Sequence, residues 1–111
     1  MVTAELAMGL PLLVALTWVL AWLLSLGVAQ VRMVDAARET ARAVARGDPV
    51  AAAISRGSQV APAGADLAVR SGQGEVVVTA TAQVSGPGGL LGLLPGVRLE
   101  ATAVAAEEYP P

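Results

Sequence analysis

Several residue types that carry chemistry in proteins are missing from this sequence. Its 111 residues include no cysteine, no histidine and no phenylalanine, and all seven cations are arginine. The absence of cysteine excludes disulfides and thiolate metal sites, and the absence of histidine removes the commonest metal ligand and general base. Catalysis would therefore need a carboxylate pair or an activated hydroxyl group. We expect no enzyme, no metal and no cofactor.

Charge and aromatic side chains are also scarce. Charged residues make up 14% of the chain, aromatic residues 3%, and the net charge is -2, while hydrophobic residues reach 55%. The charge balance gives no indication of nucleic-acid binding, and no small-molecule site can be named. The composition is typical of a membrane protein or of a subunit in an assembly.

The few acidic and glycine-rich stretches offer little as sites. Asp66, Glu75 and Glu100 lie on different predicted strands, at spacings typical of solvated faces. The GPGG stretch at 86–89 lacks the Lys-Ser/Thr of a phosphate-binding loop, so it predicts a flexible turn.

What the sequence does contain is one long uncharged run. Leu6 to Val31 is 26 residues without a charge. As a helix it would be roughly 39 Å long, enough to cross a hydrocarbon core of about 30 Å. A secretory signal peptide would have a basic start and a shorter apolar core. We therefore expect a retained transmembrane helix.

The helical pattern continues beyond this run as an amphipathic segment. Its apolar positions follow a spacing of three and four residues: Val31, Val34, Ala37, Ala41 and Val44. Asp35–Arg38 and Glu39–Arg42 are expected ion pairs on the other faces. Gly47 is expected to end the helix. The long N-terminal helix thus covers 1–47, with an apolar part at 1–31 and an amphipathic part at 32–47.

The remaining chain predicts a small α+β domain. Asp48 as N-cap and Pro49 at the first helical position predict a short helix over 48–57 that stops at Gly57. The region 58–111 then changes to a period of two, which predicts strands at 66–71, 75–84 and 97–106. A turn with Gly72 and Gly74 joins the first two strands. The expected fold is a long hydrophobic helix, a short helix and a three-stranded antiparallel sheet packed on the amphipathic segment.

Three further features of the sequence concern the shape of the long helix or its contacts. Gly9 and Pro11 predict a kink or an opening of the helix, since proline removes a helical N–H. The leucines of LLGLLP (Leu90, Leu91, Leu93 and Leu94) either close the core of the domain or contact a neighbour. A row of small residues predicts close helix packing; it consists of Ala21, Ser25, Ala29, Ala37, Ala41 and Ala45.

Glu5 is the only charge in the first 31 residues. With MVTAELA at the start, GLP at 9–11, VDAARETARAVARG at 34–47 and GLLGLLPGVRLEATAVAA at 89–106, the chain resembles type IV pilins. The resemblance is closest to actinobacterial pilins of the tight-adherence (Tad) type, including TadE-like proteins. It covers most of the chain; the Glu5 motif is fairly specific and the β domain is generic.

The resemblance implies a structural subunit that polymerises into a filament for surface adhesion. Residue 1 would be the first mature residue, released by a prepilin peptidase, although Met1 as an initiator is the alternative. Glu5 would pair with the Met1 amine of a neighbouring copy; alternatively it only favours the helix N-terminus through the dipole. The implied partners are identical copies, the inner membrane before assembly and the pilus machinery, and the mature filament would be extracellular.

Two rival functions remain at this stage. One is a minor, TadE-like pilin that primes or tips the filament, and the other is a single-pass membrane protein that never polymerises. Arg32, Arg38, Arg42 and Arg46 follow the apolar run, and the positive-inside rule would place that end in the cytoplasm. The pilin hypothesis therefore requires a basic leader to set the opposite orientation.

Overall fold

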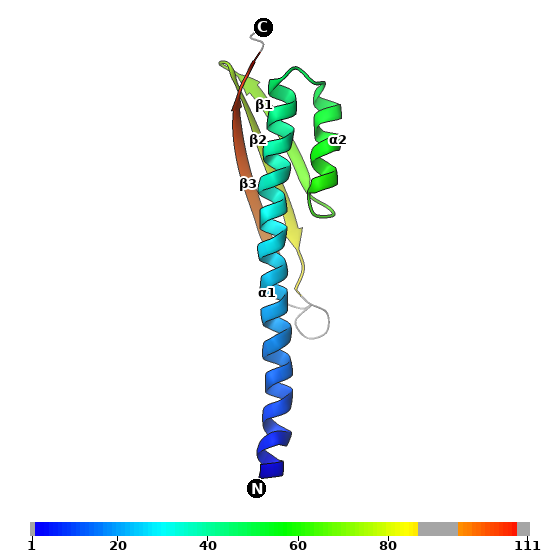
Figure 1. The fold of residues 1–111 in the computed structure, drawn as a ribbon, viewed down its shortest axis with the longest axis vertical. Coiled ribbons are helices and arrows are strands. Elements are labelled where there is room, and N and C mark those ends of the chain that lie inside the picture. The colour runs from blue at the N-terminus through cyan, green and yellow to red at the C-terminus, as the bar shows by residue number, and fades with distance from the viewer. Residues whose placement is uncertain (1, 87–95, 109–111) are drawn as a thin grey trace.

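The expected α+β fold is confirmed by a computed structural model, which describes residues 2–86 and 96–108. Two helices, α1 (Val2–Ala45) and α2 (Val50–Val60), are followed by three strands, β1 (Asp66–Gly72), β2 (Glu75–Val84) and β3 (Val97–Ala106). The molecule is a rod of 76 × 21 × 21 Å. Figure 1 shows the N-terminus at one end of the rod, and the sheet and α2 beside the other end of α1.

Helix α1 is continuous and ends as expected at Gly47. Gly47 has φ 99°, its N–H donates to the Val44 carbonyl at 3.0 Å, and the Asp48 N–H donates to the Ala43 carbonyl at 3.0 Å. These two bonds form a Schellman motif, in which glycine adopts the left-handed conformation that other residues avoid. The chain therefore reverses direction here and brings α2 back along α1.

Both predicted limits of α2 are wrong. Pro49 occupies the N-cap position without a side-chain capping bond, and Val50 is the first helical residue. The Asp48 N–H closes α1, and its carboxylate lies 3.2 Å from Arg46 and 3.7 Å from Arg56. Gly57 does not stop the helix but lies buried inside it.

The sheet is an antiparallel meander in the order β1-β2-β3. Gly72 pairs with Glu75, which leaves Gln73 and Gly74 as the two-residue turn, both with positive φ (54° and 78°). That backbone matches the twist of a tight hairpin. Strand β2 lies in the centre and alternates buried and half-buried residues, so one face of the sheet is covered.

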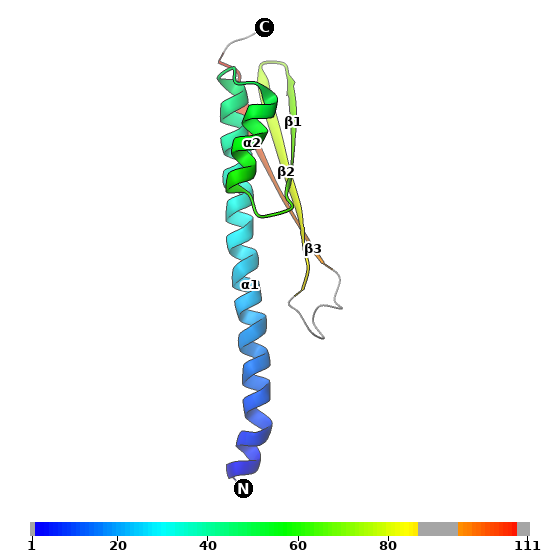
Figure 2. The ribbon, with the colours of Figure 1, turned by 90° about the vertical axis from the view of Figure 1, so that its right-hand side faces the viewer.

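That face packs on the C-terminal half of α1, and Figure 2 shows the layers from the side. The core contains Met33, Ala37, Ala41 and Ala45 from α1, against Val76, Val78, Ala80, Ala82 and Ala101 from the sheet. Ala36 and Thr40 are buried as well, because α2 covers a second side of α1. Val31, expected on the buried face, is 60% exposed. The sequence pattern had indicated one covered face, whereas α1 has two.

Candidate assembly site on the N-terminal helix

The N-terminal half of α1 projects from the domain with its apolar side chains uncovered. Of the described residues, this helix is long and apolar enough to cross a membrane, and no residue of its most apolar 18-residue window is buried. Figures 1 and 2 show this bare segment extending away from the sheet. Its large exposed side chains are Val2, Leu6, Met8, Leu10, Leu12, Leu13, Val14, Leu16, Trp18, Leu20, Leu23, Leu24, Val28 and Val31.

Such a surface is not stable in water by itself. Monomeric soluble proteins rarely expose large contiguous apolar patches, and those that exist usually mark contacts with protein or lipid. Two of the three hydroxyl groups on this segment are satisfied within the helix: Thr17 Oγ1 donates to the Leu13 carbonyl at 2.8 Å, and Ser25 Oγ to the Trp22 carbonyl at 2.7 Å. The segment can therefore enter lipid or a helix bundle without leaving these donors unpaired.

Glu5 lies in the first turn of α1 and is exposed. It makes no ion pair with any residue in 2–86 or 96–108. Its predicted partner, the amine of Met1 in a neighbouring copy, lies outside the described residues, so the pairing stays a prediction. A carboxylate near a helix N-terminus is also favoured by the dipole, by up to about 1 kcal/mol at an exposed position.

Gly9 and Pro11 both lie inside the helical segment. The helix continues through Pro11, and a Cβ placed on Gly9 would meet nothing within 4 Å. The predicted unwinding concerns the transfer from lipid to a filament and stays a prediction. In the single chain, the stretch is helical.

The row of small residues divides into two parts. Ala37, Ala41 and Ala45 belong to the core with the sheet, so their small size serves packing within the chain. Ala21 and Ser25 are exposed and Ala29 is half-buried. Only the N-terminal part of the row, before Met33, is open to a second helix. The four leucines at 90, 91, 93 and 94 lie outside the described residues.

A shallow apolar groove runs along the bare helix and was missed by the sequence analysis. It is lined by Leu10, Leu13, Val14, Thr17, Trp18 and Ala21. The signal was present, because these positions follow a spacing of three and four residues. This spacing could not be recognised as a groove because the segment is apolar on every face of the helix.

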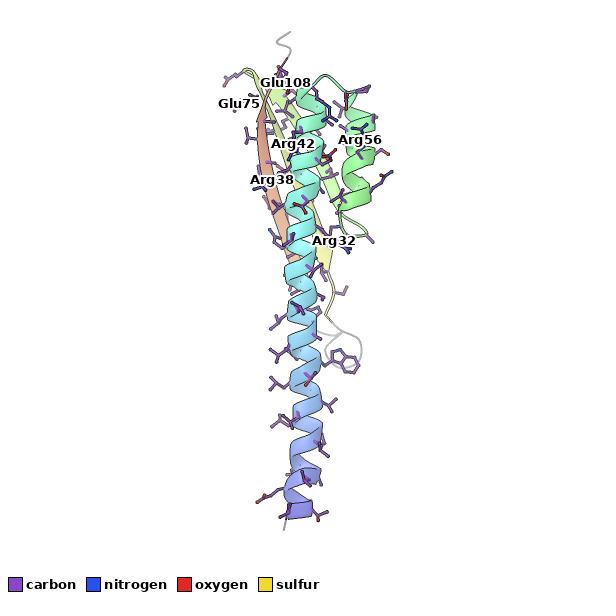
Figure 3. The ribbon with its side chains drawn as sticks, in the orientation of Figure 1. Arg32, Arg38, Arg42, Arg56, Glu75 and Glu108 are labelled. Carbon is purple, nitrogen blue, oxygen red and sulfur yellow. The ribbon has the colours of Figure 1, made fainter. Side chains whose placement is uncertain are left out.

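A second, polar groove separates α1 from α2. Arg38 and Arg42 of α1 and Arg56 of α2 line it, together with Asp35 and Glu39. Figure 3 shows these arginines on the two neighbouring helices, while Glu75 and Glu108 lie at the end of the molecule far from the bare helix. The expected pairs Asp35–Arg38 and Glu39–Arg42 are wrong for the described residues, whose ion pairs are Arg46–Asp48, Arg56–Asp48 and Arg98–Glu100.

The acidic residues of the strands form no centre for chemistry. Asp66, Glu75 and Glu100 are exposed and lie on three different strands. In the part of the chain that the structure describes, no cluster of three or more acidic, histidine or cysteine side chains is placed to hold a metal ion.

Comparison with family models, with curated proteins and with solved structures found no match to this chain. The class that the fold defines is an α+β protein with one N-terminal helix able to cross a membrane and a small folded domain at its far end. A more particular function has to be inferred from the bare helix and its single carboxylate.

Proposed function

We propose that the chain is a structural pilin subunit that polymerises through α1 into a Tad-like type IV pilus. The observation that carries this proposal is the N-terminal segment of α1, which exposes its apolar side chains and has Glu5, near its tip, as its only charge before Arg32. A purely anchoring helix has no need of a carboxylate there. An assembling helix can use one to select its partner.

In a bundle of apolar helices, Glu5 needs a partner. An ionised carboxylate in such surroundings costs at least a few kcal/mol unless it is paired and hydrogen-bonded. The Met1 amine of a neighbouring copy would neutralise it and fix the axial offset between the two helices. If each copy offers its amine to one neighbour and its Glu5 to another, the contact is heterologous and extends into an open helical filament.

The same proposal assigns the subunit one location before assembly and another after it. Before assembly the chain is stored in the inner membrane as a single-pass protein, with a leader removed by a prepilin peptidase. After assembly the α1 helices form the core of an extracellular filament and the small β domains form its outside, where adhesion takes place.

The decisive test is Glu5→Gln, with Glu75→Gln as the matched control. Both changes replace an exposed carboxylate by an amide, but Glu75 lies at the hairpin end of the sheet. Glu5→Gln should leave membrane insertion intact and lower the yield of sheared surface filaments about tenfold or more, because the neighbour's amine would be buried without its partner. Normal filament yield from Glu5→Gln would disprove the pairing.

A minor pilin is the nearest alternative, and the stoichiometry of sheared filaments separates the two. Mass spectrometry should find this chain as the principal component if it is the major subunit. A trace amount beside another pilin would assign it to priming or tipping the filament.

One observation favours the non-polymerising alternative. Arg32, Arg38, Arg42 and Arg46 follow the apolar run, and such a bias is typical of a cytoplasmic flank. Because the chain has no cysteine, a single cysteine at Ser71 reports topology through labelling of intact cells. Labelling by a membrane-impermeant reagent is expected for a pilin, and protection from it would favour a cytoplasmic domain.

A further inference from the structure

The end of the sheet nearest the bare helix reaches well down the apolar run. We call this end the foot of the sheet; it consists of Ser85 and Gly86 after β2, and Gly96, Val97 and Arg98 at the start of β3. Trp22 Nε1 donates to the Ser85 carbonyl at 3.3 Å, and Gln30 Nε2 donates to the Glu100 carbonyl at 3.1 Å. The foot therefore lies beside α1 between Trp22 and Gln30, within the stretch that has no charge of its own.

This position conflicts with full insertion of the uncharged run. If Leu6 to Val31 lay upright in hydrocarbon, Arg98 and Glu100 would be carried in with it, and their side chains are 69% and 55% exposed. The backbone of Ser85, Gly86 and Gly96 lies beyond the last paired residues, Val84 and Val97. Charges and irregular backbone exposed to lipid are both strongly unfavourable.

The part of α1 below the foot has the length of a bilayer core. Val2 to Ala21 is 20 residues, or roughly 30 Å of helix, which equals the usual hydrocarbon thickness. The two tryptophans of the chain, Trp18 and Trp22, lie at the upper end of this stretch. Tryptophan is enriched at membrane–water interfaces, where its ring is in the apolar layer and its N–H can find a polar partner.

We propose that the hydrocarbon boundary falls at Trp22 and that the foot of the sheet rests on the lipid headgroups. The occupant of this surface is a phospholipid bilayer, with Arg98 at the depth of the phosphates. Glu5 then lies three residues from the opposite end of the span, close to the headgroups of the other leaflet.

This placement differs from the boundary at Val31 that the sequence alone predicts. It leaves Leu24, Val28 and Val31, all on exposed parts of α1, above the hydrocarbon. The boundary at Trp22 requires only that α1 crosses a membrane, and it is the same whether or not the subunit polymerises.

The test uses single cysteines in the full chain, reconstituted in phosphatidylcholine–phosphatidylglycerol vesicles and labelled with an environment-sensitive fluorophore. Lipids that carry a quencher either at mid-chain or at the headgroup report the depth of each label. The positions are Leu12, Leu16, Leu24 and Val28 on α1, and Ser85 at the foot. Ser71, at the hairpin end of the sheet, is the matched control, because Ser→Cys changes little in size and both serines are exposed.

We expect labels at Leu12 and Leu16 to be quenched most by the mid-chain quencher, and labels at Leu24, Val28 and Ser85 by the headgroup quencher. Headgroup quenching at Ser85 should be several-fold stronger than at Ser71. Mid-chain quenching at Leu24 and Val28 equal to that at Leu16 would overturn the boundary. Equal, weak quenching at Ser85 and Ser71 would show that the domain stands clear of the membrane and would overturn the headgroup contact.

Discussion

At the scale of single residues, Gly57 sets the distance between the two helices. A Cβ at this position would overlap Thr40 Oγ1 and would lie 2.7 Å from Leu67 Cδ1 and 3.2 Å from the Ala36 carbonyl oxygen. Thr40 itself is fully buried, and its hydroxyl donates to the Ala36 carbonyl at 2.8 Å. The absence of a side chain at 57 is thus what allows α2 to pack on α1.

Gly57→Ala should destabilise the domain by about 1 to 3 kcal/mol, the usual range for overpacking a tight contact. Gly27→Ala is the matched control, since it also lies within a helix and its Cβ would meet nothing within 4 Å. Urea unfolding of the full chain in detergent, followed by circular dichroism, measures both. Equal midpoints for the two variants would contradict the packing argument.

The double variant Thr40→Ala/Gly57→Ala tests the same contact from the other side. Removing the Thr40 hydroxyl and methyl group gives the new Cβ its space, so the loss in the double variant should be smaller than the sum of the two single losses. Additive losses would show that Leu67 or the backbone, and not Thr40, opposes the change.

The two errors in predicting α2 arise at this scale. Glycine is a poor helix former and aspartate a good N-cap, so local rules ended the helix at Gly57 and began it at Asp48. Contact with Thr40 requires a glycine inside the helix, and the Schellman motif of α1 already engages the Asp48 backbone. Neither contact is visible in a local sequence window.

At the scale of elements, β2 is the strand on which the domain depends. It pairs with both neighbours and directs Val76 and Val78, both fully buried, at α1. In a core built mainly of alanine, these are among the largest fully buried side chains. Their methyl groups therefore contribute a large share of the apolar area that the domain buries.

Val78→Ala should lower the free energy of unfolding by about 2 to 3 kcal/mol, from lost apolar burial and the cavity that remains. Val104→Ala is the control, because Val104 on β3 is 59% exposed, and its loss should be within about 0.5 kcal/mol. Chemical denaturation in detergent distinguishes them. A large effect at Val104 would instead indicate that the outer face of the sheet is covered, as in an oligomer.

Pro11 gives α1 a local weak point even though the helix is continuous. Proline has no N–H to donate to the Ala7 carbonyl, so that acceptor lacks its helical partner. Pro11→Ala should slow hydrogen–deuterium exchange of the amides around residues 7–14 in detergent, and it should slow or reduce filament assembly if opening is required. Unchanged exchange would show that neighbouring groups already compensate for the missing bond.

Most elements could be predicted from the sequence because their periods are clear. The change from a spacing of three and four to a period of two marks where the helices end and the strands begin, and Gly47 and Gly74 lie at the predicted turns. The exposure of Val31 and the burial of Ala36 could not be predicted. The burial of Ala36 depends on α2 folding back along α1, and the exposure of Val31 depends on how far the covering elements extend along the helix. In an alanine-rich segment, no stripe of large residues distinguishes the two covered faces.

At the scale of the whole molecule, the buried core and the exposed apolar surface occupy different lengths of the long axis. Among the described residues, the hydrophobic core begins at Met33, whereas the large exposed apolar side chains of α1 lie between Val2 and Val31. The domain does not need the bare half of the helix for its core. The folded domain is therefore suited to water, and the bare half of α1 is suited to lipid or to other apolar surroundings.

Removing residues 1–26 should give a chain that dissolves without detergent and unfolds in one cooperative transition on heating. The Gln30–Glu100 contact is kept in this fragment. The full chain should need detergent or vesicles under the same conditions. Aggregation of the fragment, or the absence of a thermal transition, would show that the bare segment supports the fold.

The candidate site illustrates what a single chain can reveal. Glu5 and the apolar run were evident from the sequence, because one charge in 31 residues stands out against any composition. The position along the apolar run at which the sheet contacts α1 was not evident from the sequence, since it depends on long-range contacts such as Trp22 with Ser85. Contacts between copies are visible neither in the sequence nor in the structure of one chain. The Glu5→Gln experiment tests them directly.

The termini of this rod lie at opposite ends, and β3 runs along the rod toward the C-terminal end (Figure 1). A tensile load applied between the bare helix and the C-terminal end would draw β3 lengthwise past β2 and α1. The ten register pairs between β2 and β3 would then resist together in shear, and they would not open one at a time as in an unzipped hairpin. The long axis of this fold is therefore also its mechanically strong direction.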